Sequence, residues 1–237
     1  MLSLFRVIKS LIVAIFLVFL LVNQAFSEPR IGLWVESEGN YQPYTNQKGF
    51  NHLKDLAREE IFTDLYCQVY RNGRSWFPSM LADDSPYREA LKAGLDPLKD
   101  SIELAKSRGQ KVHAWFNVMR IISNRRAPLF KVLGKDVTLH DNHNQSFFDY
   151  SLKGKAPRIG SREYSVGTPG IWLEPSSKKL RHYLVEQIRE VLIAYPELDG
   201  IHLDMIRQPI AAKQSNCLLY TSPSPRDATL SRMPSSA

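Results

Sequence analysis

The chain alternates segments of strand-like and helix-like hydrophobic pattern, and this alternation limits its possible folds more than any other feature. Apolar residues recur at helical spacing from Phe50 to Ala57 and from Leu180 to Tyr195. A further helix is predicted to begin after Asp96, which can cap it, and to end at Gly109. The predicted strands are residues 31–35, 61–70, 111–117 and 199–206. Strands separated by helices indicate parallel βαβ units with right-handed crossovers.

The two faces of each predicted strand differ in chemistry. One face is aliphatic and suits packing against helices: Leu33/Val35, Leu65/Val69, Val112/Ala114/Phe116 and Ile201/Leu203/Met205. The other is polar and aromatic: Trp34/Glu36, Tyr66/Gln68/Tyr70, His113/Trp115/Asn117 and His202/Asp204. An open doubly wound sheet would be apolar on both faces, whereas a (β/α)₈ barrel gathers polar groups at the carboxyl ends of its strands. The sequence therefore predicts an α/β fold, the N-terminal half of a (β/α)₈ TIM barrel over residues 28–215, preceded by a signal peptide.

Residues 1–27 have the pattern of a secretory signal peptide. Arg6 and Lys9 precede an apolar run over residues 11–22, and Ala25 and Ser27 are the small residues of a cleavage site. An uncleaved anchor is the alternative, but the run is shorter than the roughly 20 apolar residues that cross a bilayer. We therefore expect a secreted or periplasmic protein that meets the membrane only during export.

Residues 216–237 show no hydrophobic periodicity. One interpretation is a disordered tail rich in serine and proline. The other comes from back-translation, because codons for residues 217–222 and 231–237 can be written so that they resemble two parts of a sequencing adapter, in the right order. We expect that the genuine sequence stops near Ser215, that residues 216–237 are a disordered adapter translation, and that the barrel is C-terminally truncated.

Composition excludes several classes of protein. With 237 residues, 43% hydrophobic and 23% charged, the chain is neither disordered nor collagen-like. Cys67 and Cys217 are its 2 cysteines, too few for a disulfide framework. The net charge of +7 falls to about +4 without the two ends, so no nucleic-acid partner is predicted. No phosphate-binding glycine loop occurs, and the histidines at 140 and 143 lack a metal-ligand spacing, so we expect neither cofactor nor metal.

Asp204 is the predicted catalytic residue. A carboxylate at the carboxyl end of a barrel strand can act as a nucleophile or stabilise an oxocarbenium-like transition state. The alternative is a structural aspartate bound by Arg207 or a loop amide. Asp199, which precedes Gly200, is instead predicted to shape the turn before the strand.

Hydrogen-bonding and aromatic side chains on the same face predict carbohydrate binding, because a sugar has polar edges and apolar faces. His113, Trp115 and Asn117 alternate onto one face of a single strand, although they could instead form an internal barrel layer. Trp76 and Trp172 could also stack on sugars, but a lone tryptophan is more often buried. The other predicted substrate-binding residues are Trp34, Gln68, Tyr70, His202 and Arg207.

The connection from about residue 118 to 171 is too long for a plain loop. It contains basic residues among aromatic ones, for example Arg125, Arg126, Phe147 and Phe148. Connections of this length are often lids or binding loops. This composition suits an acidic polysaccharide or single-stranded nucleic acid, and secretion favours the polysaccharide. A solvated insertion with local aromatic packing is the alternative.

Several short motifs, in this order and spacing, resemble the glycosyl hydrolase-like 10 family of secreted bacterial proteins. They are Ile31-Gly-Leu-Trp-Val35, Gln68-Val-Tyr70, Asp96-Pro-Leu98, His113-Ala-Trp-Phe-Asn117, Glu174-Pro175 and Asp199-Gly-Ile-His-Leu-Asp-Met-Ile-Arg-Gln-Pro209. The resemblance implies a TIM-barrel domain active on carbohydrate, with Asp204 at the matching acidic position. The sequence departs from the family at Met205 and Gln208, where aromatic residues are common.

These observations together predict an O-glycosyl hydrolase acting on cell-envelope or extracellular polysaccharide, inactive as the fragment given. Hydrolysis needs a second carboxyl group; Glu36 and Glu174 are the nearby candidates, and a missing later strand is the better source. The alternative is a non-catalytic, secreted glycan-binding or envelope-scaffold protein with the same aromatic pocket. The expected partner in either case is a polysaccharide or oligosaccharide.

Overall fold

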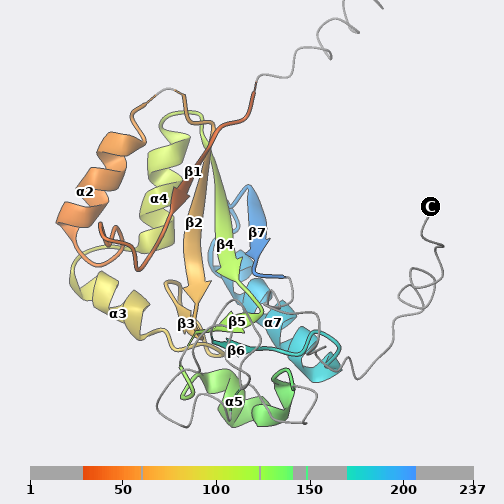
Figure 1. Ribbon diagram of the computed structural model, residues 1–237. Helices are drawn as coiled ribbons and strands as arrows, with labels where there is room; N and C mark the ends of the chain where they lie inside the picture. The colour runs from red at the N-terminus through yellow and green to blue at the C-terminus, as the bar shows by residue number, and fades with distance from the viewer. Residues whose placement is uncertain (1–28, 60, 123, 141–147, 149–169, 207–237) are drawn as a thin grey trace, which may run out of the picture. The chain divides into compact units, whose positions relative to one another are not determined.

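A parallel sheet forms the centre of the computed structural model, which describes residues 29–59, 61–122, 124–140, 148 and 170–206 (Figure 1). Its strands run in the order β1-β2-β4-β7, and each neighbouring pair is parallel. A short strand, β3 (Arg74–Ser75), pairs antiparallel with β2. The parallel strands are β1 (Gly32–Val35), β2 (Asp64–Arg71), β4 (Lys111–Asn117) and β7 (Gly200–Asp204). Because they follow chain order, the predicted series of βα units is confirmed for this part of the chain.

The helices begin at capping residues that the sequence supplies. Before α4 (Pro97–Lys106), the Asp96 carboxylate accepts the backbone N–H of Lys99, as predicted. The Asn46 side chain caps α2 (Gln47–Leu56) and the Ser177 hydroxyl caps α7 (Lys178–Ala194) in the same way. A shorter helix, α3 (Ser85–Lys92), has a proline in its first turn instead.

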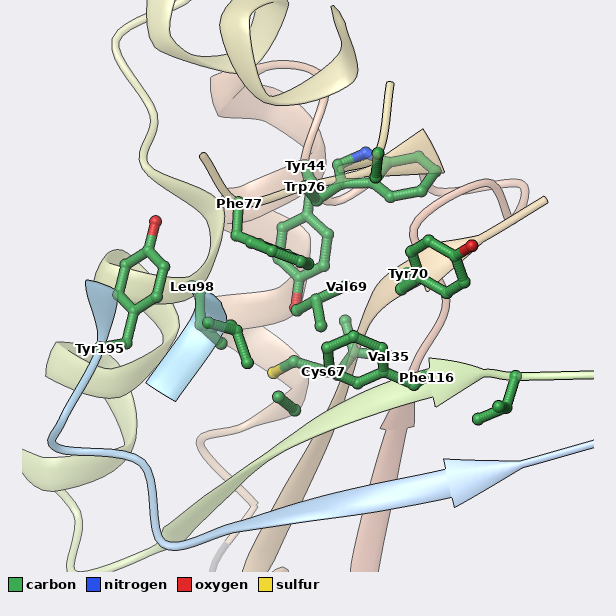
Figure 2. Close-up of a cluster of buried hydrophobic side chains, with 14 of the residues drawn as sticks. Val35, Tyr44, Cys67, Val69, Tyr70, Trp76, Phe77, Leu98, Phe116 and Tyr195 are labelled. Atoms are coloured by element: carbon green, nitrogen blue, oxygen red, sulfur yellow. The ribbon is translucent and has the colours of Figure 1, made fainter. Parts of the chain in front are cut away.

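The hydrophobic core lies between the helices and the aliphatic face of the sheet. Cys67 and Val69 of β2 and Phe116 of β4 are fully or almost fully buried there, against Tyr44, Leu98 and Tyr195 from the helical side (Figure 2). Burying one such side chain contributes about 1.5–3 kcal/mol. The predicted aliphatic face is therefore confirmed for β1, β2 and β4.

The last strand departs from that prediction. Leu203 of β7 is 40% exposed, so the helices cover this edge of the sheet only in part. Met205 does not continue the strand, because its φ of +55° lies in the left-handed region. Hydrophobic alternation predicts which side chains share a face of a strand. It does not predict whether a helix covers that face, nor the residue at which the strand ends.

A small substructure lies beyond the carboxyl ends of the strands (Figure 1). Here β5 (Arg120–Ile121) and β6 (Ile171–Trp172) pair antiparallel. Between them in the chain come α5 (Pro128–Leu133) and a 3₁₀ turn, η1 (Lys135–Val137). It forms part of the long connection predicted to be a lid or binding loop. Trp172 and Trp76 are 0% and 3% exposed, so neither presents a ring to a ligand.

Two predicted segments, the signal peptide (1–27) and the tail (216–237), lie outside the described residues. Within the described part, no helix combines the length and the apolar character needed to span a membrane.

Candidate functional site

Aromatic rings from all four parallel strands meet on the face of the sheet opposite the core. Tyr66 of β2 stacks on both Trp34 of β1 and His113 of β4, with ring centroids 4.8 Å apart in each pair. Trp34 also meets Trp115 and His202 edge-on, at 4.9 and 4.6 Å. These contacts follow from register, because Trp34 pairs with Tyr66, and Tyr66 with His113. We call these five residues the ring cluster.

Two glycines leave room for the ring cluster at the amino ends of the strands. A Cβ on Gly32 would lie 2.5 Å from the Tyr66 ring, and one on Gly200 would lie 2.7 Å from Nδ1 of His113. His113 is fixed further by Asp64, whose Oδ1 lies 2.7 Å from its Nε2. The Thr63 hydroxyl donates to the other oxygen of Asp64. The Tyr66 and His113 rings are thus packed against the backbone of the neighbouring strands, which fixes their position on the sheet.

Asp204 is the last residue of β7 and lies beside the ring cluster. Its Oδ2 accepts the indole N–H of Trp115 at 3.2 Å, and its Oδ1 accepts the backbone N–H of Met205 at 2.6 Å. The chain leaves the strand directly after this contact, at the positive φ of Met205. Each carboxylate oxygen therefore has one donor, which fixes the orientation of the group while the residue stays partly exposed.

Asn117 adds a further polar group beside Asp204. Register pairs these two residues at the carboxyl ends of β4 and β7. The Asn117 Oδ1 atom is buried and has no hydrogen-bond partner among the described residues. A buried acceptor without a donor costs free energy unless a ligand or water supplies one, so the Asn117 oxygen needs a donor that the described residues do not supply.

Two predicted substrate-binding residues, Gln68 and Tyr70, do not join this group. Gln68 faces the same side but is 1% exposed, and its carbonyl oxygen accepts the N–H and the hydroxyl of Ser37, which follows β1. Tyr70 is 0% exposed and lies in the core near Phe116 (Figure 2), so its predicted position on the polar face is wrong. The register shifts between Gln68 and Tyr70, and this bulge turns Tyr70 toward the helices. Arg207 lies outside the described residues.

The structure adds Tyr66, at the centre of the ring cluster, to the predicted site residues. It lies on the same strand face as Gln68, and the pairing of its strand with the strand of His113 would have indicated it. Asp199, predicted to shape the turn before its strand, instead ties the start of β7 to β4. Its carboxylate accepts the backbone N–H of Val112 at 2.9 Å.

The two other candidate carboxylates lie in different surroundings. Glu174 accepts the backbone N–H of Ser176 and so closes the turn before α7. Glu36 is exposed and lines a cavity of about 320 Å³ along β1 and α2, together with Tyr41 and His52. Among the residues that the structure describes, no three His, Cys, Asp or Glu side chains gather as metal ligands would.

The parallel sheet, with helices on one face and polar and aromatic residues on the other, defines an α/β protein consistent with part of a TIM barrel. Within that class, the chain belongs to the glycosyl hydrolase-like 10 family, which it matches over residues 30–218. The resemblance seen in the sequence motifs is confirmed.

Curated relatives carry the name glycosyl hydrolase DigH, from Escherichia coli K12 and from Shigella flexneri. Each is 25% identical to this chain over 203 residues. The match covers 77% of this chain and 43% of each relative, so the chain spans less than half the length of these proteins.

Proposed function

We propose that the protein is a glycoside hydrolase acting on cell-envelope or extracellular polysaccharide, with Asp204 as one of two catalytic carboxyl groups. The observation that carries this proposal is the position of Asp204, fixed by two donors at the carboxyl end of β7 and adjoining the ring cluster. The family and the names of its relatives support a glycosidase-like activity. Export is part of the proposal and follows from the signal-peptide pattern of residues 1–27.

The ring cluster supplies the sugar-binding half of such a site. Trp34 is 49% exposed although it packs against three other rings, so it presents an aromatic surface to solvent. A sugar stacked there would place its hydroxyls near His202. Asp204 would then attack the anomeric carbon as a nucleophile, or take the proton of an attacking water molecule as a general base, while the leaving-group oxygen takes a proton from the second carboxyl group.

The second carboxyl group decides the stereochemical outcome. Retaining enzymes place it about 5–5.5 Å from the first, whereas inverting enzymes leave about 6.5–9.5 Å for a water molecule. We propose that a part of the full-length protein outside the described residues supplies this group, because Glu174 closes a turn and Glu36 faces the cavity along β1 and α2.

The test is Asp204→Asn in the full-length protein, assayed on insoluble envelope and extracellular polysaccharides by release of reducing ends. The amide keeps the shape but loses the charge, so we expect kcat to fall by about 10²–10⁴-fold with unchanged thermal unfolding. Asp55→Asn on α2 is the matched control, since Asp55 is an exposed carboxylate paired with Arg58. Retained turnover in Asp204→Asn would exclude a catalytic role, and tight glycan binding without any cleavage would favour the glycan-binding alternative.

A further inference from the structure

Arg71, at the end of β2, takes the place on the polar face that simple alternation gives to Tyr70. The register partner of Tyr70 is Phe116, and both lie on the core side of the sheet. Successive side chains of a strand alternate between faces. Arg71 follows Tyr70 and Asn117 follows Phe116, so Arg71 and Asn117 lie on the same face. Asn117 in turn pairs with Asp204. Three neighbouring strands therefore end on one face with Arg71, Asn117 and Asp204.

A tight hairpin places a second guanidinium beside the first. Asn72 and Gly73 have φ values of +57° and +74°, the conformation of an Asn-Gly hairpin turn. The turn pairs Arg71 directly with Arg74 of β3. Glu38, in the segment after β1, lies 2.8 Å from Nη1 of Arg74 and 3.5 Å from Nε of Arg71. One carboxylate therefore faces two guanidinium groups.

This arrangement leaves positive charge and hydrogen-bond donors in excess. The Arg71 Nε atom is buried and, beyond its 3.5 Å ion pair with Glu38, makes no hydrogen bond within the described part of the chain. The side chains of Arg71 and Arg74 are 25% and 35% exposed, enough for a ligand to reach them and too little for full hydration. A guanidinium in such surroundings binds a carboxylate through paired, charge-assisted hydrogen bonds.

We propose that Arg71 and Arg74 bind the carboxylate of an acidic sugar residue in the glycan that occupies the Asp204 site. The inference rests on the proposed carbohydrate function and names the class of substrate, a polysaccharide that contains carboxylated sugars. Glu38 holds the arginines in place while no ligand is bound and competes with the ligand for them. Arg71 is thus a specificity-determining residue rather than a catalytic one.

The test compares binding of acidic polymers with binding of the same polymers after their carboxyl groups are reduced to alcohols. Polygalacturonate, alginate and hyaluronate are titrated calorimetrically into the full-length protein and into its Asp204→Asn variant. We expect at least one polymer to bind, and its affinity to fall at least about tenfold on reduction, because charge-assisted hydrogen bonds are lost. Equal binding of native and reduced polymers, or binding of none of the acidic polymers, would overturn the proposal.

Substitutions separate ligand binding from a merely structural role. Arg71→Gln and Arg74→Gln should each weaken polyuronate binding by about tenfold without affecting the reduced polymer, and Arg71→Lys should recover part of the loss. Glu38→Gln should strengthen binding, because it removes the competing carboxylate. Lys48→Gln on α2 is the control for net charge. If Arg71, Arg74 and Glu38 only stabilise the hairpin, the substitutions at these three residues will lower the unfolding temperature, and Glu38→Gln will not raise the affinity for polyuronate. Either result would contradict the proposal.

The test of acidic-sugar binding can fail or succeed independently of the proposed hydrolase activity. Arginine-dependent binding of polyuronate without cleavage would support this inference and contradict the hydrolase. Cleavage of neutral glycans alone, unaffected by Arg71→Gln, would support the hydrolase and contradict this inference. Arginine-dependent binding of dextran sulfate without binding of any polyuronate would assign the site to sulfate and would also contradict it.

Discussion

At the scale of single residues, the site depends on close approach between side chains and glycines. Gly200 begins β7 directly beside the His113 ring, which also pairs with Asp64 and stacks on Tyr66. One methyl group at this position would move the ring, and the shift would be passed on through Tyr66 to Trp34. The requirement for glycine here comes from space, since φ at Gly200 is not in the left-handed region.

We therefore expect Gly200→Ala to destabilise the fold by about 1–3 kcal/mol, the usual cost of overpacking. Urea unfolding followed by tryptophan fluorescence measures the loss, since Trp34 and Trp115 belong to the ring cluster. In the double variant Gly200→Ala/His113→Ala the clash is absent, so the combined loss should be smaller than the sum of the two single losses. Strict additivity would show that the clash with His113 is not the cause.

Cys67 illustrates how burial alone sets chemical behaviour. Its side chain is fully buried, in the core position predicted from its strand face, and burial raises the pKa of the thiol from 9.0 to about 11. In a Cys217→Ser background, a thiol reagent at pH 8 should label the native protein far more slowly than the unfolded protein. Rapid labelling in the native state would contradict the burial of this thiol.

The raised pKa of Cys67 also predicts a pH dependence of stability. The folded thiol keeps its proton to higher pH than the unfolded one, so its contribution is complete below about pH 9 and lost as pH rises through about 11. Relative to Cys67→Ala, the free energy of unfolding should fall across this interval. Parallel curves for the two proteins would show that the thiol ionises equally in both states.

At the scale of elements, the β2–β3 hairpin joins the parallel sheet to the segment before α5. Gly73 has a φ of +74°, and a Cβ there would lie 2.4 Å from the Cβ of Ala127. The Asn124 side chain donates to the carbonyl oxygen of Asn72, so the two segments are also hydrogen-bonded. The hairpin thus carries Arg71 and Arg74 and fixes the start of the substructure beyond the strands.

Gly73→Ala should consequently cost more stability than a comparable change elsewhere. Gly109→Ala is the matched control, because Gly109 has a similar φ of +68° but nothing within 4 Å of its Cβ position. We expect about 1 kcal/mol for Gly109→Ala from backbone conformation alone, and clearly more for Gly73→Ala. Thermal unfolding of both variants measures the difference, and equal losses would mean that contact with Ala127 contributes nothing.

Hydrophobic periodicity predicted the parallel strands, the helices α2, α4 and α7, and the polar face with Trp34, His113 and Asp204. It could not predict the bulge in β2, since strict alternation assumes one residue per register step, and so it placed Tyr70 where Arg71 lies. Strands of two residues, such as β5 and β6, are too short for any period to be recognised. The hydrogen bond between Trp115 and Asp204 depends on register between segments 89 residues apart in the chain.

At the scale of the whole molecule, function depends on where the protein is delivered. The proposed substrate, a polysaccharide of the envelope or outside the cell, would reach the site only if the chain is exported, and the signal peptide predicted for residues 1–27 would supply the route. N-terminal sequencing of the mature protein from a bacterial host should therefore find Glu28 as its first residue. Recovery of a chain that begins at Met1 and fractionates with membranes would instead indicate an uncleaved anchor.

The bulge between Gln68 and Tyr70 has a consequence for how this lineage can diverge. The bulge adds one residue to β2 opposite β4, so the strand resumes its alternation with Tyr70 on the core side and Arg71 on the polar side. In a relative with the same residues but a regular strand, the equivalent of Tyr70 would face the ligand and the equivalent of Arg71 would face the helices. The residue that ends this strand on the ligand side can thus change through the position of a bulge, while the letters of the sequence stay the same.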